Sequence, residues 1–406
     1  MATPFRVSLM IICLLFLIIS PLTFDFYNSS NIDAVMDNVF TKGAEISKEM
    51  TVSFGRYEWK IDWPYPPITI LFILPSWYFY NYISDNIFLY QYLFKLPIFL
   101  SVVICGYILE KNTRTNKFSS AYLLNPGIIF LTIFWGGFDI INGLLLFLTY
   151  HFYIQRKYSK GLFMLSLASA LRIYPIVLLP LFLIPYIRLR KFKEIIKYSL
   201  ITISAPFTFF ILGNFLGNGS LTELILFYQS SYGPFGIYPI LLSIVIIINK
   251  FRVSSIDRSV IPFILLSLLF LSQTAIFLLN YKGVINLKKS ILISLLLIFL
   301  FYPKMHSLYI LAVLPISILL ENWRVTKSLW IPGTIWALFV NGIEDNRGLP
   351  YWFYWLTHYK FSLPEMYNHG ITILMSTLYL SLIVICILNI LKPSEKPQNN
   401  TNTLVN

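Results

Sequence analysis

The chain has 406 residues, of which 57% are hydrophobic and only 12% are charged. Soluble domains carry about 25% charged residues, so this composition excludes a water-soluble core with a polar shell and indicates an integral membrane protein. The net charge of +13 is better explained by cytoplasmic loops, which collect Lys and Arg in membrane proteins, than by nucleic-acid binding.

The chain begins with an apolar segment, Met1 to Phe24, whose only charged residue is Arg6. No small-residue cleavage site follows it, and Pro21 stands where cleavage of a signal peptide is expected. We therefore expect a retained signal-anchor with its N-terminus in the cytoplasm.

The next stretch, residues 25–87, is the expected first extracytoplasmic loop. Seven of the 18 acidic residues of the chain lie in it, between Asp25 and Pro67, which suggests chemistry at this membrane face. The proline-interrupted segment Pro66–Tyr82 is expected to lie along the outer interface. If it crossed the membrane, the basic loop Lys111–Lys117 would face outward, against the usual cytoplasmic placement of basic loops.

The remaining apolar segments are assigned alternating directions, which puts the basic loops in the cytoplasm. They cover residues 88–109, 119–135, 138–154, 161–171, 174–187, 196–215, 260–281, 291–301, 307–320, 328–341 and 370–391, with a half-buried outer helix at 237–248. The sequence thus predicts an all-α bundle of about 11 to 13 membrane segments. It forms a single membrane domain over residues 1–391, followed by a disordered cytoplasmic tail at 392–406.

Two neighbouring segments, 161–171 and 174–187, are shorter than the roughly 20 residues that a straight span needs. They predict a re-entrant pair that turns at Arg172-Ile173-Tyr174-Pro175. A backbone broken at membrane depth is tolerated only where protein or water covers it, so we expect this turn to lie at a cavity.

Charged and polar residues gather at the outer ends of the predicted segments. Each alone has a simpler explanation: a solvated loop carboxylate, a carboxylate that complements a helix dipole at Asp139, or an arginine that reaches the interface at Arg172. Their shared side favours a site that binds phosphate and removes a proton. These residues are Asp25, Asp33, Asp37, Asp139, Arg172, Tyr174, Lys304 and His306. The three cysteines lie in apolar runs without metal-site spacing, so no metal site is expected.

Five short motifs occur in order between about residue 25 and residue 310. They are Asn31-Ile32-Asp33 with Val39-Phe40, Trp63-Pro64-Tyr65-Pro66-Pro67, Leu124-Asn125-Pro126 with Gly137-Phe138-Asp139, Arg172-Ile173-Tyr174-Pro175, and Pro303-Lys304-Met305-His306-Ser307-Leu308-Tyr309. In type and order they resemble motifs of the GT-C glycosyltransferases. The resemblance is closest to the GPI mannosyltransferase I type and the bacterial and archaeal family 87 mannosyltransferases.

The resemblance implies a hexosyltransferase, most closely a mannosyltransferase. It would move a sugar from polyprenyl or dolichyl phosphate to a glycolipid or glycan acceptor at the extracytoplasmic face. Asp33 would be the catalytic base, with Asp37 and Asp25 behind it. The substrates would be bound by Asp139, Arg172, Tyr174, Lys304, His306 and Tyr309.

Two departures from the family pattern bear on the chemistry. Asn31 replaces the first acidic residue of the first-loop motif, which puts a role for a divalent metal in doubt, and no other cofactor is expected. Arg172 replaces a lysine but keeps the charge that a phosphate needs.

The implied location is the bilayer of a prokaryotic plasma membrane or of the endoplasmic reticulum, without a nucleic-acid partner. A transporter or flippase of lipid-linked sugars is the alternative, although transporters place their charged groups near the bilayer midplane. A non-catalytic membrane subunit is a third hypothesis.

Overall fold

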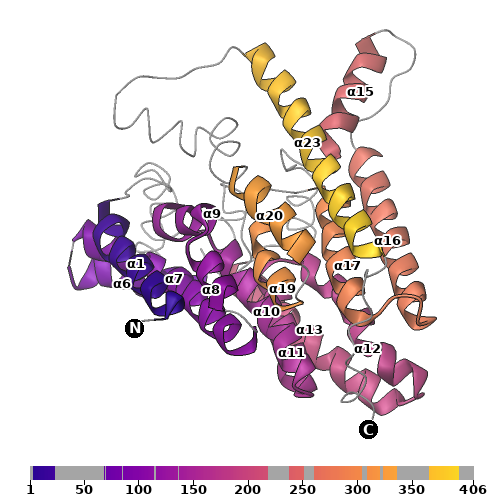
Figure 1. Cartoon of the computed structure of the whole chain (residues 1–406), viewed down its shortest axis with the longest axis horizontal. Helices are drawn as coiled ribbons and strands as arrows, with labels where there is room; N and C mark the ends of the chain where they lie inside the picture. Colours follow the sequence, from indigo (N-terminus) through magenta and orange to yellow (C-terminus); the bar gives the residue numbers. More distant parts are fainter. Residues whose placement is uncertain are drawn as a thin grey trace.

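The structure is a computed structural model that describes residues 3–22, 68, 70–84, 86–113, 116–135, 137–217, 237–250, 260–303, 309–320, 323–335 and 365–392. All regular elements in these ranges are helical, which confirms the predicted all-α class (Figure 1). The first half of the chain contributes α1 (Pro4–Ile19), η1 (Ser20–Leu22), α6 (Ile70–Tyr82), α7 (Ile87–Asn112), α8 (Asn116–Leu123), α9 (Pro126–Ile129), η4 (Phe130–Trp135), α10 (Asp139–Ile154), α11 (Tyr158–Leu171), η5 (Tyr174–Leu178), α12 (Leu179–Arg188) and α13 (Phe192–Gly217). The second half contributes α15 (Tyr238–Lys250), α16 (Val260–Tyr281), α17 (Leu287–Phe301), α18 (Tyr309–Ala312), α19 (Leu314–Leu319), α20 (Trp323–Ile335) and α23 (Glu365–Leu391).

Several helices begin at side chains that bond to the first free backbone N–H groups. The Asn86 side chain accepts hydrogen bonds from the backbone N–H groups of Phe88 and Leu89, at 3.0 and 3.2 Å, and starts α7. Asn286 starts α17 in the same way through the N–H of Lys289, at 2.9 Å. Such caps satisfy donors that have no partner inside the helix. The helices therefore begin where local sequence dictates, and α16 coincides with the predicted segment 260–281.

Two predicted continuous spans are interrupted in the structure. Segment 119–135 divides into α8 and α9 at Asn125, and α9 continues into the π-helical turns of η4. Within segment 307–320, α18 and α19 are separated at Val313. In both cases a proline, Pro126 or Pro315, stands in the first turn of the new helix. Proline lacks the N–H that would continue the preceding helix, which explains the interruptions.

Helix α10 lies at the centre of the bundle and contacts α7, α11, α18 and α19 (Figure 1). Glycine permits the closest of these approaches. A Cβ on Gly143 would lie 2.9 Å from the backbone Cα of Ala312, and a Cβ on Gly161 would lie 2.9 Å from the carbonyl oxygen of Thr149. Small residues allow such backbone contact in membrane bundles. The contacts hold α10 against α18 and α11, from which the candidate site is built.

Two described helices are long and apolar enough to cross a membrane, namely the Phe88–Asn112 part of α7 and all of α16. The outer face of α16 carries large exposed apolar side chains: Phe263 is 73% exposed and Phe270, two turns later on the same face, is 72% exposed. The outer faces of α1, α13 and α23 expose further large apolar residues. Apolar surface of this extent marks contact with a membrane or with another protein.

Candidate active site

The site begins where the helical chain is interrupted between α11 and η5, at the position where the sequence predicts a turn. Arg172 ends α11 with extended backbone angles, φ −147° and ψ 127°, and its N–H still bonds to the carbonyl oxygen of Ala168 at 2.9 Å. Tyr174 and Pro175 then open the short helix η5. A proline in this first turn cannot continue the helix before it. The predicted interruption at Arg172 is therefore observed, and it directs the Arg172 side chain toward α10.

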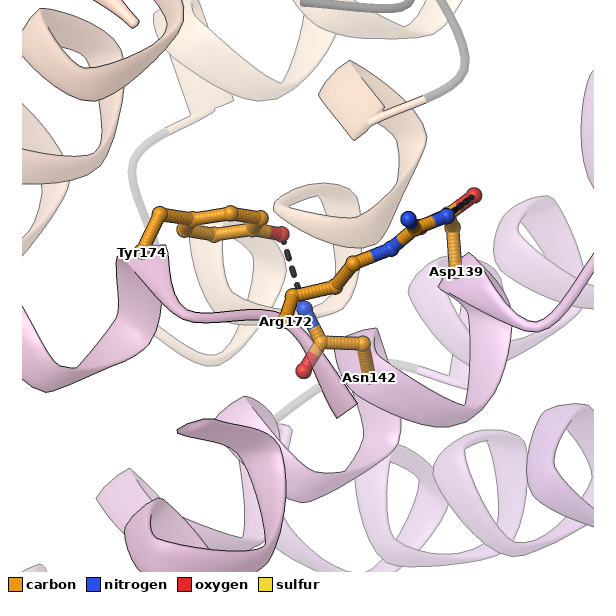
Figure 2. A network of polar contacts seen from close by, with 4 residues as sticks. All are labelled: Asp139, Asn142, Arg172 and Tyr174. Atoms are coloured by element: carbon orange, nitrogen blue, oxygen red, sulfur yellow. Dashed lines mark hydrogen bonds and ion pairs between the residues drawn. The ribbon is translucent and has the colours of Figure 1, made fainter. Parts of the chain in front are cut away.

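Arg172 forms an ion pair with Asp139, the first residue of α10. Its Nε donates to Oδ1 of Asp139 at 2.8 Å and its Nη2 donates to Oδ2 at 3.1 Å (Figure 2). The Arg172 side chain is 14% exposed and the Asp139 side chain 7%. Two parallel charge-assisted bonds fix the guanidinium plane as well as its position. The charges thus compensate each other in a largely water-excluded place.

One turn along α10 from Asp139, Asn142 binds Tyr174, the third residue of the turn. Its Nδ2 donates a hydrogen bond of 2.8 Å to the phenolic oxygen of Tyr174 (Figure 2). Both side chains are buried, and Oδ1 of Asn142 has no hydrogen-bond partner within the described residues. Residues three apart on a helix share a face. The same face of α10 therefore anchors both Arg172 and Tyr174.

Aromatic rings from the end of α17 and from α18 complete the site. The Arg172 guanidinium carbon lies 5.1 Å from the ring centre of Tyr309, a distance typical of cation–π contact. The Tyr174 ring lies 5.9 Å from the ring of Tyr309 and 6.1 Å from that of Tyr302. Burial raises the pKa of the Tyr302 phenol to about 12, although the nearby Arg172 cation acts in the opposite direction. This phenol therefore stays protonated and able to donate at neutral pH.

The structure brings together four of the residues that the sequence suggested, from three separate parts of the chain: Asp139, Arg172, Tyr174 and Tyr309. The remaining suggested residues lie outside the described ones; they are Asp25, Asp33, Asp37, Lys304 and His306. Sequence reasoning missed Asn142 and Tyr302. The position of Asn142, three residues after Asp139, was the available signal, because it places both on one helix face.

One motif residue has a structural role instead. The side-chain oxygen of Asn125 accepts hydrogen bonds from the N–H of Ile128, at 3.0 Å, and from the hydroxyl of Thr334, at 3.1 Å. It thereby caps α9 and fastens it to α20. The Asn-Pro pair of the resemblance is thus explained here by helix capping.

A further ionisable residue is buried, and the sequence interpretation does not include it. Lys95 of α7 is 1% exposed, and its ammonium donates to the carbonyl oxygen of Ser20, in η1, at 3.2 Å. Charged residues inside candidate membrane helices are costly and are therefore functional candidates. Lys95 thus forms another buried polar contact in the bundle, between α7 and η1.

The chemistry available to the described site follows from its parts. A fixed guanidinium with a carboxylate on one side and phenol rings on the other suits a polar ligand with hydroxyl or anionic oxygen atoms. Within the described residues, no group of three or more His, Cys, Asp or Glu side chains could hold a metal ion.

The sequence was compared with known proteins in two ways. No family model matches the chain, and no curated protein matches it.

Proposed function

We propose that this protein is a multi-pass membrane glycosyltransferase of the GT-C type. Among these enzymes its motifs resemble those of mannosyltransferases most, so we propose mannose as the transferred sugar. The protein would transfer this hexose from polyprenyl phosphate to a glycolipid or glycan acceptor at the extracytoplasmic face. The observation that carries the proposal is the meeting of three separated motifs. Asp139, Arg172 and Tyr309 each come from a different motif of the resemblance, and they lie in contact around one guanidinium.

Placement in a bilayer is supported by the distribution of apolar surface. Helix α16 passes the length and composition test for a span, and its exposed residues include Phe263 and Phe270. In water these side chains would cost free energy, whereas lipid chains would cover them. The proposal therefore assigns the outer faces of α1, α13, α16 and α23 to lipid.

In the proposed reaction an acceptor hydroxyl attacks the anomeric carbon of the donor. A bond forms between that oxygen and the sugar carbon, and the bond from the sugar carbon to the phosphate oxygen breaks, so that polyprenyl phosphate leaves. The hydroxyl proton passes to a carboxylate, for which the sequence proposes Asp33, a residue outside the described part of the chain. General-base assistance of this kind contributes about 10²–10⁴ in rate.

Arg172 is proposed to meet the phosphate as charge builds on it. Two of its donors point to Asp139, so that the carboxylate orients the guanidinium and compensates its charge. A phosphate that approaches this pair would find a preoriented donor. Asp139 is thus a positioning residue for Arg172 in this mechanism, and Tyr302 is a further hydrogen-bond donor.

A transporter of lipid-linked sugars is the second candidate, favoured by the interrupted helices. Discontinuous helices form the substrate sites of many transporters. The breaks between α11 and η5 and between α18 and α19 are of this kind. Against it, Asp139 is the first residue of α10 rather than a mid-helix residue.

The proposal is tested with purified protein in liposomes, labelled polyprenyl-phosphate mannose and a mixture of glycolipid acceptors. We expect labelled glycolipid from the wild type and at least about tenfold less from an equal amount of folded Arg172→Gln, because glutamine lacks the cation that would meet the phosphate. Glu194→Gln is the matched control, since this exposed carboxylate lies 4.0 Å from Lys197 in a surface pair. Equal turnover of wild type and Arg172→Gln would remove Arg172 from the mechanism.

A further inference from the structure

Two basic chain connections lie together at one end of the molecule. One joins α12 to α13 and the other joins α16 to α17 (Figure 1). Arg188, at the end of α12, links them: its Nη2 donates to the carbonyl oxygens of Asn280 and Tyr281, at 2.6 and 2.5 Å. The last carbonyl groups of α16 are thereby satisfied by a residue of the other connection.

Both connections have defined turn geometry. Arg190 has a positive φ of 53°, and the N–H of Lys191 bonds back to the carbonyl oxygen of Tyr186 at 2.9 Å. Gly283 has a φ of 78°, and the N–H of Val284 bonds to the carbonyl oxygen of Leu279 at 2.9 Å. The left-handed conformation at Gly283 ends α16 in the manner of a C-terminal cap. The backbone of the two connections therefore has a defined course.

The face so formed is strongly cationic. Across residues 188–197 and 278–289 the only acidic residue is Glu194, which lies 4.0 Å from Lys197. The exposed cations of the face are Arg188, Arg190, Lys191, Lys193, Lys197, Lys282 and Lys288. So many like charges in one place strongly attract anions.

Large apolar side chains stand between these cations along the chain and are exposed as well. Leu189 is 64% exposed, Phe192 is 69% exposed and Val284 is 68% exposed. A nucleic acid or an acidic protein segment would satisfy the cations but would leave these side chains in contact with polar groups. A molecule with an anionic head and apolar chains satisfies both kinds of side chain at once. This alternation decides the chemical class of the partner.

We propose that this basic–apolar face binds anionic phospholipids. The phosphate headgroups lie against the cations of the two connections, and the acyl chains cover Leu189, Phe192 and Val284. The inference does not depend on sugar transfer. It assigns the face to an anionic leaflet, where each surface lysine or arginine contributes about fivefold in affinity.

The test is native mass spectrometry of the full chain in detergent, with phosphatidylglycerol and phosphatidylcholine of identical acyl chains as probes. We expect the anionic lipid to bind in preference to the neutral one. A variant with Lys191→Gln, Lys193→Gln, Lys282→Gln and Lys288→Gln should lose at least about tenfold of that preference. The matched control removes four exposed lysines elsewhere: Lys111→Gln, Lys117→Gln, Lys157→Gln and Lys160→Gln.

The apolar part of the face is tested separately with Leu189→Ser, Phe192→Ser and Val284→Ser combined. This variant should bind both lipids more weakly and keep its preference for the anionic one, because its cations remain. Equal binding of the two lipids by wild type, or equal losses in the two lysine variants, overturns the proposal. So does displacement of bound phosphatidylglycerol by an oligonucleotide or a polyglutamate peptide at lower concentration than by free glycerol phosphate.

Discussion

The buried pair of Asp139 and Arg172 makes a sharp prediction about stability. Asp139→Asn leaves the guanidinium, whose side chain is 14% exposed, without its carboxylate, and Arg172→Met leaves the carboxylate, 7% exposed, without its cation. Removal of one partner of a buried pair costs about 3–5 kcal/mol. For Arg172→Met the loss in free energy of unfolding should fall at the lower end of this range. The N-terminal end of the α10 dipole stabilises the unpaired Asp139 carboxylate by about 0.3–1 kcal/mol.

The double variant separates pairing from simple loss of side-chain atoms. With neither charge present no ion is left buried, so the double variant should cost less than either single one by about 1–2 kcal/mol, a strong departure from additivity. Unfolding by sodium dodecyl sulfate in mixed micelles, followed by tryptophan fluorescence, measures these differences. The exposed Glu194–Lys197 pair is the control, and there the same cycle should give less than about 1 kcal/mol.

The reasoning is refuted by additive losses at Asp139 and Arg172, or by losses below about 1 kcal/mol for both single variants. Either outcome would mean that water reaches the pair freely, because only a solvated charge tolerates the loss of its partner at so little cost.

Three further predictions follow from other contacts. Tyr174→Phe should cost about 1–3 kcal/mol by leaving the buried Nδ2 of Asn142 without its acceptor, and Asn142→Leu in the same chain should recover most of it, as measured by the same unfolding assay. Gly143→Ala should cost about 1–3 kcal/mol, because the new Cβ would lie 2.9 Å from the Ala312 Cα, whereas Gly137→Ala should be tolerated, since among the described residues its Cβ would meet nothing closer than 3.9 Å. Cysteines placed at Thr115 and Lys191 should resist an impermeant thiol reagent in intact cells and one placed at Ser47 should react; labelling at 115 would overturn the orientation proposed for the basic loops.

Local signals in the sequence were sufficient for part of the fold. The prediction for segment 260–281 matches the bounds of α16, since a long, uncharged and mostly apolar segment between charged residues leaves little choice. The interruption at Arg172 was also predictable, because Pro175 cannot continue the preceding helix. The breaks at Asn125 and Val313 rest on the same kind of proline and were overlooked inside apolar runs.

The arrangement of the site depends on contacts that sequence spacing does not encode. Asp139 and Arg172 were both placed at outer segment ends, but their direct pairing requires the close approach of α10 and α11 across 33 residues. Asn125 belongs to a motif of the resemblance, and the sequence does not show that it also binds Thr334, which is 209 residues away. Sequence patterns identify which residues are unusual, whereas the packing of helices decides which of them meet.

The central claim is that the protein breaks the bond between the sugar and the phosphate of the donor, and does not carry the intact donor across the membrane. The most direct measurement follows donor carrying label in both the mannose and the polyprenyl phosphate through proteoliposomes that contain the purified chain and glycolipid acceptor. The account predicts that free polyprenyl phosphate and mannosylated acceptor appear in equal amounts, and that Asp33→Asn slows both by about 10²–10⁴. Intact donor that changes leaflet without release of polyprenyl phosphate would contradict the account and establish the transporter in its place.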